Sequence, residues 1–427
     1  MGLDNIAIIE GGRRLGQEVH HRSSNVMINL PQNTTRSTWK TALTWGIGLA
    51  IGLRIALGII MAAAWLVLEP NLPSSLPSVY GALEMPASRL GTLLLGVWPR
   101  WDAVHHLNLA MNGYLSLSLG DSVFYPLYAG LTRFIALLLG GNFILAGLIV
   151  STLSAACAFS LLYVLGSDMF GLDSGKWAAI SMAVYPTAVF LVAPFTESLF
   201  IALTLASVYL AYRNRWLATA AFALLASLTR GPGIFLAVPI AIIAARRFIC
   251  STERSSIPTK LSALAAIGAP LVGGFAFIAW RSMAGFPSMT VILGEYANQS
   301  MVDPLTGLTT ALWQWFVTFD LPTTLDTLSA LLLLAITAAI AINPRWRKPE
   351  ILAFMIVNVV FHLSFRVQGA TSLRSLSRYV LDLFPVFLVW GDYLANSRPK
   401  TRFIYVVASS ALLLILSVLY SLWFFVG

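Results

Sequence analysis

The segment PRWDAVHHLNLAMNGY at 99–114 holds the densest group of side chains that could do chemistry in this sequence. Asp102, His105 and His106 have the i, i+3 and i+4 spacing that puts them on one helical face. A carboxylate or an imidazole can act as a general base and deprotonate an attacking hydroxyl. The alternative interpretation is an amphipathic helix at a membrane surface, with Trp101 in the aromatic belt.

Three further segments place ionisable groups beside apolar stretches. Glu197 opens such a stretch in PFTESLF, and Arg230 precedes two glycines in LTRGPG. The segment RSLSRYVLDLFP contains Arg374, Arg378 and Asp382. Arginine grips phosphate oxygens with two N–H groups at once, so arginines beside carboxylates suit an anionic substrate that carries a phosphate.

Each of these segments also has a purely structural interpretation. Glu197 would be favourable at the positive end of a helix dipole. Arg230 and the glycines after it would simply end a helix, although glycines also let the backbone approach a ligand closely. Arg378 and Asp382, four residues apart, would form a structural ion pair on one helix.

The amino-acid composition indicates the class of protein in which these residues lie. Of the 427 residues, 58% are hydrophobic and only 11% charged, whereas a soluble domain has about 25% charged residues. This excludes an ordinary soluble globular protein. The formal net charge of +9 is interpreted as an orientation signal, and no nucleic-acid partner is predicted.

We expect an all-α polytopic membrane protein, since a bilayer core needs about 20 apolar residues per helix. The sequence predicts 11 spanning helices, with approximate limits 41–68, 142–166, 177–193, 196–212, 216–229, 232–249, 261–281, 325–342, 350–366, 378–395 and 403–425.

The remaining segments are expected outside the bilayer core. Residues 1–40 form a cytoplasmic tail, and 41–427 form a single transmembrane domain with outer segments at 69–141 and 282–324. The first outer loop is expected to hold interfacial or re-entrant helices. Among them the stretch 122–139 re-enters the membrane without crossing it, interrupted by Pro126 and Arg133.

Lysine and arginine indicate which side of the membrane each loop faces. With the N-terminus inside, the basic groups at 213–215, 246–260, 345–348 and 398–402 all fall on the cytoplasmic side. The four segments that contain candidate functional residues then all fall on the extracytoplasmic side. These segments were not used to assign the sides. A channel would be expected to have a ring of one sign of charge instead.

In their order along the chain, these segments resemble a known family. RWDAVHHLNLAMNGY, FYPLYAGLTRF, the block from Tyr185 to Gly233 and SRYVLDLFPVFL look like the phosphatidylinositol-glycan class V type (PIG-V-like) mannosyltransferases of the GT-C glycosyltransferase fold. The resemblance covers about residues 98–240 and 376–390. Phe195 stands where the family has a tyrosine, and Ala129 where it has a second proline.

The resemblance implies inverting transfer of mannose from a polyprenyl-phosphate donor to a lipid-linked or other glycan acceptor. The reaction would take place at the periplasmic or lumenal face, here expected to be that of a bacterial inner membrane. Asp102 matches the family's presumed base. The donor and acceptor would be bound by side chains in all four segments: Trp101, His105, His106, Glu197, Arg230, Arg374, Arg378 and Tyr379.

No cofactor is expected, since GT-C enzymes with monophosphate donors generally work without metal. The less favoured possibility is a divalent metal held by Asp102, His105, His106 and Glu197, whose oxygen and nitrogen atoms are suitable ligands. Two other functions stay open: a transporter or flippase of lipid-linked sugars, and transfer of a different sugar. A transporter typically shows internal repeats and polar groups near the membrane midplane, which this sequence lacks.

Overall fold

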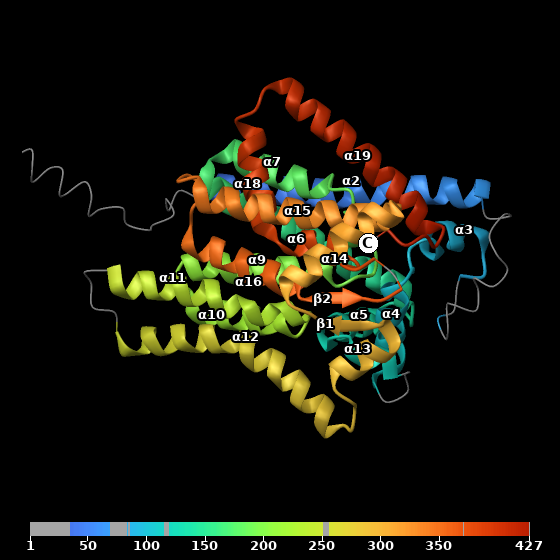
Figure 1. Ribbon diagram of the computed structural model, residues 1–427, viewed down its shortest axis with the longest axis horizontal. Helices are drawn as coiled ribbons and strands as arrows, with labels where there is room; N and C mark the ends of the chain where they lie inside the picture. The colour runs from blue at the N-terminus through green and yellow to red at the C-terminus, as the bar shows by residue number, and fades with distance from the viewer. Residues whose placement is uncertain are drawn as a thin grey trace, which may run out of the picture.

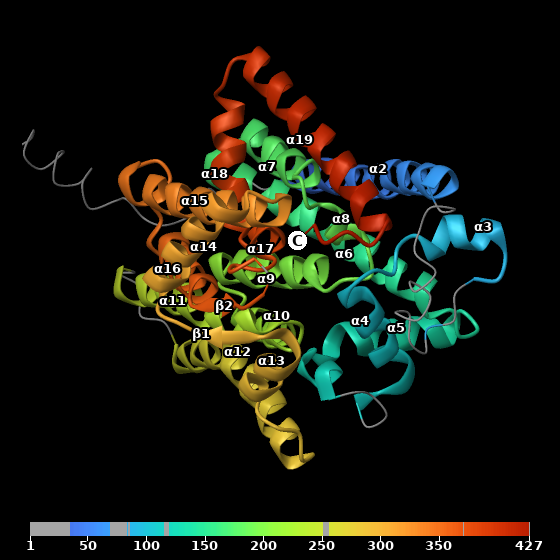
Figure 2. The same cartoon turned by 45° about the vertical axis from the view of Figure 1, so that its right-hand side comes forward.

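The computed structural model describes residues 35–68, 83, 86–114, 119–250, 256–369 and 371–426. In these residues the chain is helical apart from two three-residue strands, so the prediction of an all-α chain is confirmed there. Many of the long helices run roughly side by side, and the shorter elements α3, α4, α5 and α13 gather towards one end (Figure 1). Figure 2 shows the same grouping from a second direction.

Six helices in the described residues are long and apolar enough to cross a membrane. They are α2 (Arg36–Leu68), α6 (Phe143–Phe170), η6 with α11 (Gly231–Leu236 and Ala237–Cys250), α12 (Ile257–Met283), α15 (Leu321–Ile342) and α19 (Pro399–Ser421). Shorter apolar helices pack among them: α5 (Pro126–Leu138), α9 (Glu197–Tyr212), α10 (Trp216–Ser227), α16 (Pro349–Leu363) and α18 (Phe384–Ala395).

The other elements are short and connect or cover these helices. They are α3 (Arg89–Gly91), η3 (Thr92–Gly96), α4 (Asp102–Asn112), η5 (Leu119–Val123), α7 (Leu172–Ala183), α8 (Val189–Val192), α13 (Met289–Ala297), α14 (Pro304–Thr318), α17 (Leu376–Tyr379) and η7 (Val380–Asp382). Strands β1 (Gln299–Met301) and β2 (Phe365–Val367) pair antiparallel, with Ser300 opposite Arg366.

The structure does not confirm the count of 11 spans, and several of the predicted segments differ from it. The predicted span 378–395 is broken, because α17 and η7 come before α18, which starts at Phe384. The predicted span 177–193 is broken: α7 ends at Ala183 and α8 starts at Val189, because Pro186 lies in the turn between them.

The stretch 122–139 is interrupted at only one of the two predicted residues, because η5 ends at Val123 and a new helix starts at Pro126. Pro126 starts α5, where its missing N–H costs nothing, and Arg133 lies within the unbroken helix. At 13 residues, α5 is about 20 Å long, which is short of a bilayer core.

The predicted domain limits are only partly within the described residues. Of the tail 1–40, residues 1–34 lie outside them, and α2 already starts at Arg36. Within the first outer loop, 69–82, 84–85 and 115–118 lie outside as well. The second outer segment, 282–324, is not a simple loop, because it contains α13, β1 and α14.

The ion pairs separate into two groups that match the two sides inferred from sequence. Arg213–Asp168, Arg246–Glu350 and Arg345–Asp392 join groups predicted to be cytoplasmic. The other pairs join groups predicted to be extracytoplasmic, with Asp382 at the edge of a span. No ion pair among the described residues joins one side to the other.

Close helix contacts depend on glycines at particular points. Helix α18 lies so close to α7 that a Cβ on Gly391 would be 2.4 Å from the backbone nitrogen of Ala178. Between α6 and α7, a Cβ on Gly175 would be 2.2 Å from the carbonyl oxygen of Tyr163. These contacts hold α18 against α7, and α17 and η7 lead directly into α18.

Gly391→Ala is therefore expected to destabilise the protein, because the new methyl group has to push α18 away from α7. Overpacking of this kind costs about 1–3 kcal/mol. The measurement is the thermal unfolding midpoint in detergent, with Gly52→Ala as the control, because a Cβ on Gly52 would meet nothing within 4 Å. Equal midpoints for the two variants would contradict the close packing of α18 on α7.

Candidate active site

Helix α4 carries Asp102, His105 and His106. An arginine outside the helix fixes each of its two ends. Before the helix, the buried Arg100 donates to the carbonyl oxygens of Ser421 (2.8 Å) and Gly96 (2.7 Å). After it, Arg133 of α5 donates to the carbonyl oxygens of Ala110 and Met111, the last turn of α4. A cation at a helix C-terminus also interacts favourably with the helix dipole. Neither arginine was predicted to be part of the site.

The junction just before α4 has an unusual backbone. Trp101 has a φ of 53° and a ψ of −127°, and a bulky residue with positive φ is rare and costs free energy. The tryptophan is held there because its indole nitrogen donates to the Phe424 carbonyl oxygen (3.3 Å) and its ring packs edge-on against Trp423 and Phe425. Strain immediately before Asp102 is typical of a functional position.

Two arginines and three carboxylates meet at the centre of the site, and we call these five residues the charge cluster: Asp102, Glu197, Arg230, Arg378 and Asp382. Arg378 is 2.9 Å from Asp102 and 3.0 Å from Glu197. Arg230 is 2.6 Å from Glu197 and 3.2 Å from Asp382. Thus Glu197 joins the two arginines. The cluster brings together all four segments that the sequence analysis selected.

The alternative interpretation of the last segment, a structural Arg378–Asp382 ion pair, does not hold. Asp382 pairs with Arg230 and not with Arg378. An i, i+4 pair requires a continuous α-helix, but α17 ends at Tyr379 and continues as the 3₁₀ turn η7. Arg378 therefore contacts Asp102 and Glu197 instead.

Aromatic rings enclose the two guanidinium groups. The Tyr379 ring lies 5.1 Å from the guanidinium carbon of both arginines and stacks on His362. The Phe195 ring lies 5.4 Å from that of Arg378. Phe195 thus presents an aromatic face to a cation.

The charge cluster is largely buried, and Asp102 is its most exposed member. The side chains of Glu197 and Asp382 are 0% and 1% exposed, whereas that of Asp102 is 36% exposed. Burial raises the pKa of Asp102, but the charge of Arg378 and of two neighbouring histidines outweighs it, and the pKa falls to about 2. Asp102 is therefore a carboxylate at any physiological pH.

His105 and His106 are adjacent in sequence but have opposite environments. The His105 side chain is 49% exposed, and its Nδ1 contacts the carboxylate of Asp121 in η5. His106 is 4% exposed and lies among the rings of Phe124, Tyr128 and Phe195. Burial lowers the pKa of His106 to about 4, so this ring is neutral at physiological pH.

Two of the predicted binding residues lie beside the charge cluster and have no ion pair in it. Arg374 is exposed and its guanidinium lies 4.9 Å from the ring of Phe425. Trp101 contacts the same Phe425. The two side chains thus meet on the C-terminal segment, where no functional residue was predicted.

The glycines after Arg230 have a packing role. A Cβ on Gly233 would lie 2.5 Å from the Cα of Ser227, so the chain can turn from α10 into η6 only with glycine there. A Cβ on Gly231 would be 3.2 Å from the hydroxyl of Tyr125. The structure therefore explains Gly233 by a close turn and not by the approach of a ligand.

Asp121 and Asp326 are site residues that the sequence analysis did not select. Asp326 of α15, 2% exposed, accepts hydrogen bonds from the hydroxyl of Thr371 (2.8 Å) and the backbone N–H of Ser377 (2.9 Å). It therefore fixes the segment that carries Arg378. A lone acidic residue in an apolar helix was the available signal, since such residues are costly and functional by default.

The described residues contain no group of three or more histidine, cysteine, aspartate or glutamate side chains placed to hold a metal ion. His105 is turned to Asp121, and both Asp102 and Glu197 are paired with arginine. These pairings give three of the four residues considered as alternative metal ligands, Asp102, His105 and Glu197, other partners.

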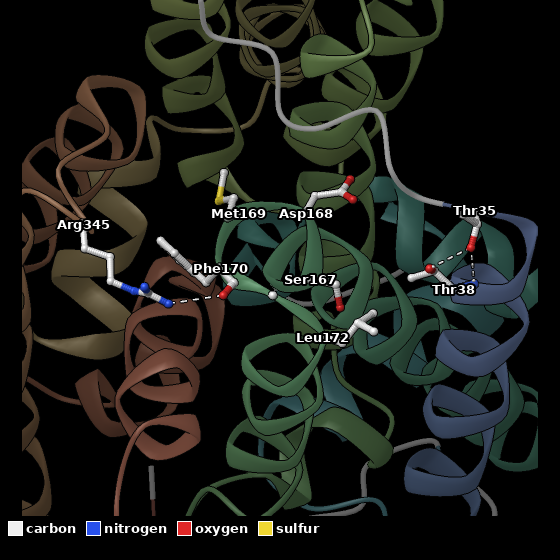
Figure 3. A pocket seen from close by; sticks show the side chains of 9 residues that line it. Thr35, Thr38, Ser167, Asp168, Met169, Phe170, Leu172 and Arg345 are labelled. Atoms are coloured by element: carbon white, nitrogen blue, oxygen red, sulfur yellow. Dashed lines mark hydrogen bonds between the residues drawn. The ribbon is translucent and has the colours of Figure 1, made fainter. Parts of the chain in front are cut away.

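A hollow of about 600 Å³ lies far from the charge cluster, at the other end of α6 (Figure 3). It is lined by Thr35, Thr38, residues 167–172 and Arg345, which donates to the carbonyl oxygen of Phe170. Gly147 of α6 lies beside Leu107 and Pro194 at the level of the charge cluster. With a rise of 1.5 Å per residue, the hollow is about 30 Å away along α6.

Comparisons with known proteins do not assign a family. No protein-family model matches the chain, and no curated protein matches it.

The hydrogen bonds of Asp326 lead to a specific expectation. Asp326→Ala leaves the Ser377 N–H and the Thr371 hydroxyl without their acceptor, which costs about 1–3 kcal/mol for each buried group. Amide hydrogen exchange of residues 371–379 should accelerate. Asp320→Ala is the control, since Asp320 caps the same helix but contacts Thr323 and not this segment. Equal exchange in the two variants would show that Asp326 does not hold the segment.

Proposed function

We propose that the chain is an integral-membrane inverting glycosyltransferase that uses a polyprenyl-phosphate-linked sugar, with mannose as the expected sugar, at the extracytoplasmic face. The observation that carries this proposal is the convergence of four distant segments on one charge cluster. The cluster contains both kinds of group that the reaction needs: guanidinium groups for a lipid phosphate and a partly exposed carboxylate for an acceptor hydroxyl.

Buried carboxylate oxygens in the cluster suit a sugar ligand. Among the described residues, Oε2 of Glu197 and Oδ1 of Asp382 are buried without a hydrogen-bond donor, whereas Oδ2 of Asp382 contacts Arg230. An unpaired buried acceptor is costly, and sugar hydroxyls are natural donors to carboxylates. These atoms are therefore candidates for contacts with the transferred sugar.

The charge balance of the cluster suggests how the donor binds. Among the described residues, the ion pairs of Asp102, Glu197 and Asp382 are all with Arg230 or Arg378. A phosphate must therefore compete with the carboxylates for the arginines. When the phosphate takes up Arg378, Asp102 loses its main positive neighbour, and its pKa rises from about 2 towards its ordinary 3.8. Donor binding thus makes Asp102 a stronger base.

In the reaction, the acceptor hydroxyl attacks the anomeric carbon while Asp102 accepts its proton. The bond between that carbon and the phosphate oxygen breaks on the opposite face, so the configuration inverts. The leaving phosphate is already stable as an anion, and the arginines stabilise its additional charge in a site partly shielded from water. No strong general acid is required.

One set of assays distinguishes the proposed transferase from the alternative, a transporter of lipid-linked sugars. Purified protein is mixed in detergent with radiolabelled polyprenyl-phosphate-mannose and candidate acceptors. A labelled product formed without a second compartment indicates a transferase, whereas movement of the lipid across proteoliposomes without product indicates a flippase. A matched set of donors carrying other sugars tests the preference for mannose in the same format.

Asp102→Asn is expected to lower kcat by at least about 100-fold, the usual effect of removing a general base. The protein should stay folded, because the Asp102 side chain is 36% exposed and asparagine has the same shape. Turnover is measured with the labelled donor, and size-exclusion profiles check folding. Asp303→Asn, an exposed carboxylate in the second outer segment, is the control. Near-normal turnover of Asp102→Asn would refute the assignment of the base.

Transfer is expected to continue in excess EDTA, because arginines and not a metal are proposed to stabilise the phosphate. The assay is repeated after dialysis against EDTA and again after adding back Mn²⁺ or Mg²⁺. Loss of transfer in EDTA and its recovery with the ion would show that the reaction needs a metal.

A further inference from the structure

The pair formed by His105 and Asp121 has no role in the reaction described so far. His105 lies one helical turn after Asp102 on α4, and residues at this spacing are neighbours on a helix surface. Asp121 contacts Nδ1 of His105, and the imidazole stacks on Phe124 at 5.4 Å. A carboxylate at Nδ1 fixes the tautomer of the neutral ring, so that Nε2 is the proton acceptor.

The proton taken by Asp102 needs a further acceptor. Even when Arg378 is displaced, a carboxyl group with an ordinary pKa of 3.8 does not keep a proton at neutral pH. The Asp102 carboxyl group must lose this proton before the next turnover. The neighbouring His105 is 49% exposed and so communicates with solvent, whereas His106 is buried.

We propose that His105, held by Asp121, is the group that removes the proton from Asp102 and passes it to water. This step rests on the proposed function. The acceptor O–H bond breaks as the glycosidic bond forms, and the proton moves to Asp102 and then to Nε2 of His105. The electron pair of the broken sugar–phosphate bond leaves with the lipid phosphate, so no other reactant is needed.

The charged neighbours of His105 support this direction of transfer. Burial lowers the pKa of His105, but the hydrogen bond to Asp121 and the charges of Asp102 and Asp121 outweigh it and raise the pKa above its ordinary 6.5. His106 is neutral at physiological pH. Arg281 of α12 contacts the carbonyl oxygen of Ser122 beside Asp121. The transfer from Asp102 to His105 therefore runs towards the group with the higher pKa.

The first test is the pH dependence of kcat. His105 must be neutral to accept a proton, so kcat should rise with pH up to a plateau. In Asp121→Asn the pKa of His105 falls, and the rising limb should move to lower pH. Asp168→Asn, which removes a similar ion pair with Arg213 at the other end of the bundle, should leave the limb in place. An unmoved limb in Asp121→Asn, or an equal shift in both variants, would overturn the proposal.

The second test uses His105→Ala, which should lose at least about tenfold in kcat and regain part of it when imidazole is added. A purely structural histidine would not be replaced by a free base in solution. Full activity of His105→Ala, or a loss that imidazole does not restore, contradicts the relay.

A third readout does not require transfer. In a His20→Gln/His21→Gln background, His105 is the exposed histidine among the described residues, because His106 and His362 are 4% and 8% exposed. The rate at which His105 is carbethoxylated is measured as a function of pH. The midpoint of this pH dependence should lie at lower pH in Asp121→Asn than in the wild type. An unshifted midpoint overturns the proposal with or without transfer. If Asp121→Asn shifts the midpoint but the wild-type protein transfers no sugar, the proposed function is refuted. The contact between His105 and Asp121 is then still supported.

Discussion

The sharing of two buried arginines among three carboxylates is the interaction on which the rest of the site depends. Removing charges from water costs several kcal/mol per ion, and the cost is offset only when every charge has a close partner of opposite sign. Glu197 is fully buried and lies between Arg230 and Arg378, so it joins the ends of α9, α10 and α17. Removing one partner of such a buried pair costs about 3–5 kcal/mol.

The surrounding helices fix the positions of these charges. Asp326 binds the segment before Arg378, and Arg133 and Arg100 fix the two ends of α4. Glycine contacts bring α18 against α7. Asp102 is the most exposed member of the charge cluster. The arrangement therefore combines a rigid, buried pair of cations with one carboxylate that a substrate can reach, which is the preorganisation that charge stabilisation in a reaction requires.

Much of this arrangement follows from the sequence, because two properties can be judged from a short segment alone. One is the free-energy cost of an ionisable group in an apolar stretch, and the other is the side of the membrane that a loop is expected to face. Ionisable groups in apolar stretches are rare enough to select Asp102, Glu197, Arg230 and Arg378 directly. The ion pairs, which separate into two groups, agree with the sides inferred from lysine and arginine. Hydropathy also locates most of the apolar helices, since burial in lipid requires long apolar runs.

What the sequence could not provide is pairing in three dimensions. Arg378 and Asp382 have helical spacing, but the change from α17 to η7 separates them and gives Asp382 to Arg230. Asp121 lies 16 residues after His105, so no local pattern connects them. Hydropathy averages over Pro186 and therefore missed the break between α7 and α8. In each case a contact between distant segments, or a single backbone break, decides the outcome.

The most direct test of the central claim is equilibrium binding of polyprenyl-phosphate-mannose to the full chain in nanodiscs. If the buried arginines bind the lipid phosphate, the wild type binds saturably and Arg230→Gln loses most of the affinity. Arg213→Gln, which alters an arginine of the opposite group of ion pairs, should bind like the wild type. Equal affinity of wild type and Arg230→Gln, or no saturable binding by the wild type, would contradict this account.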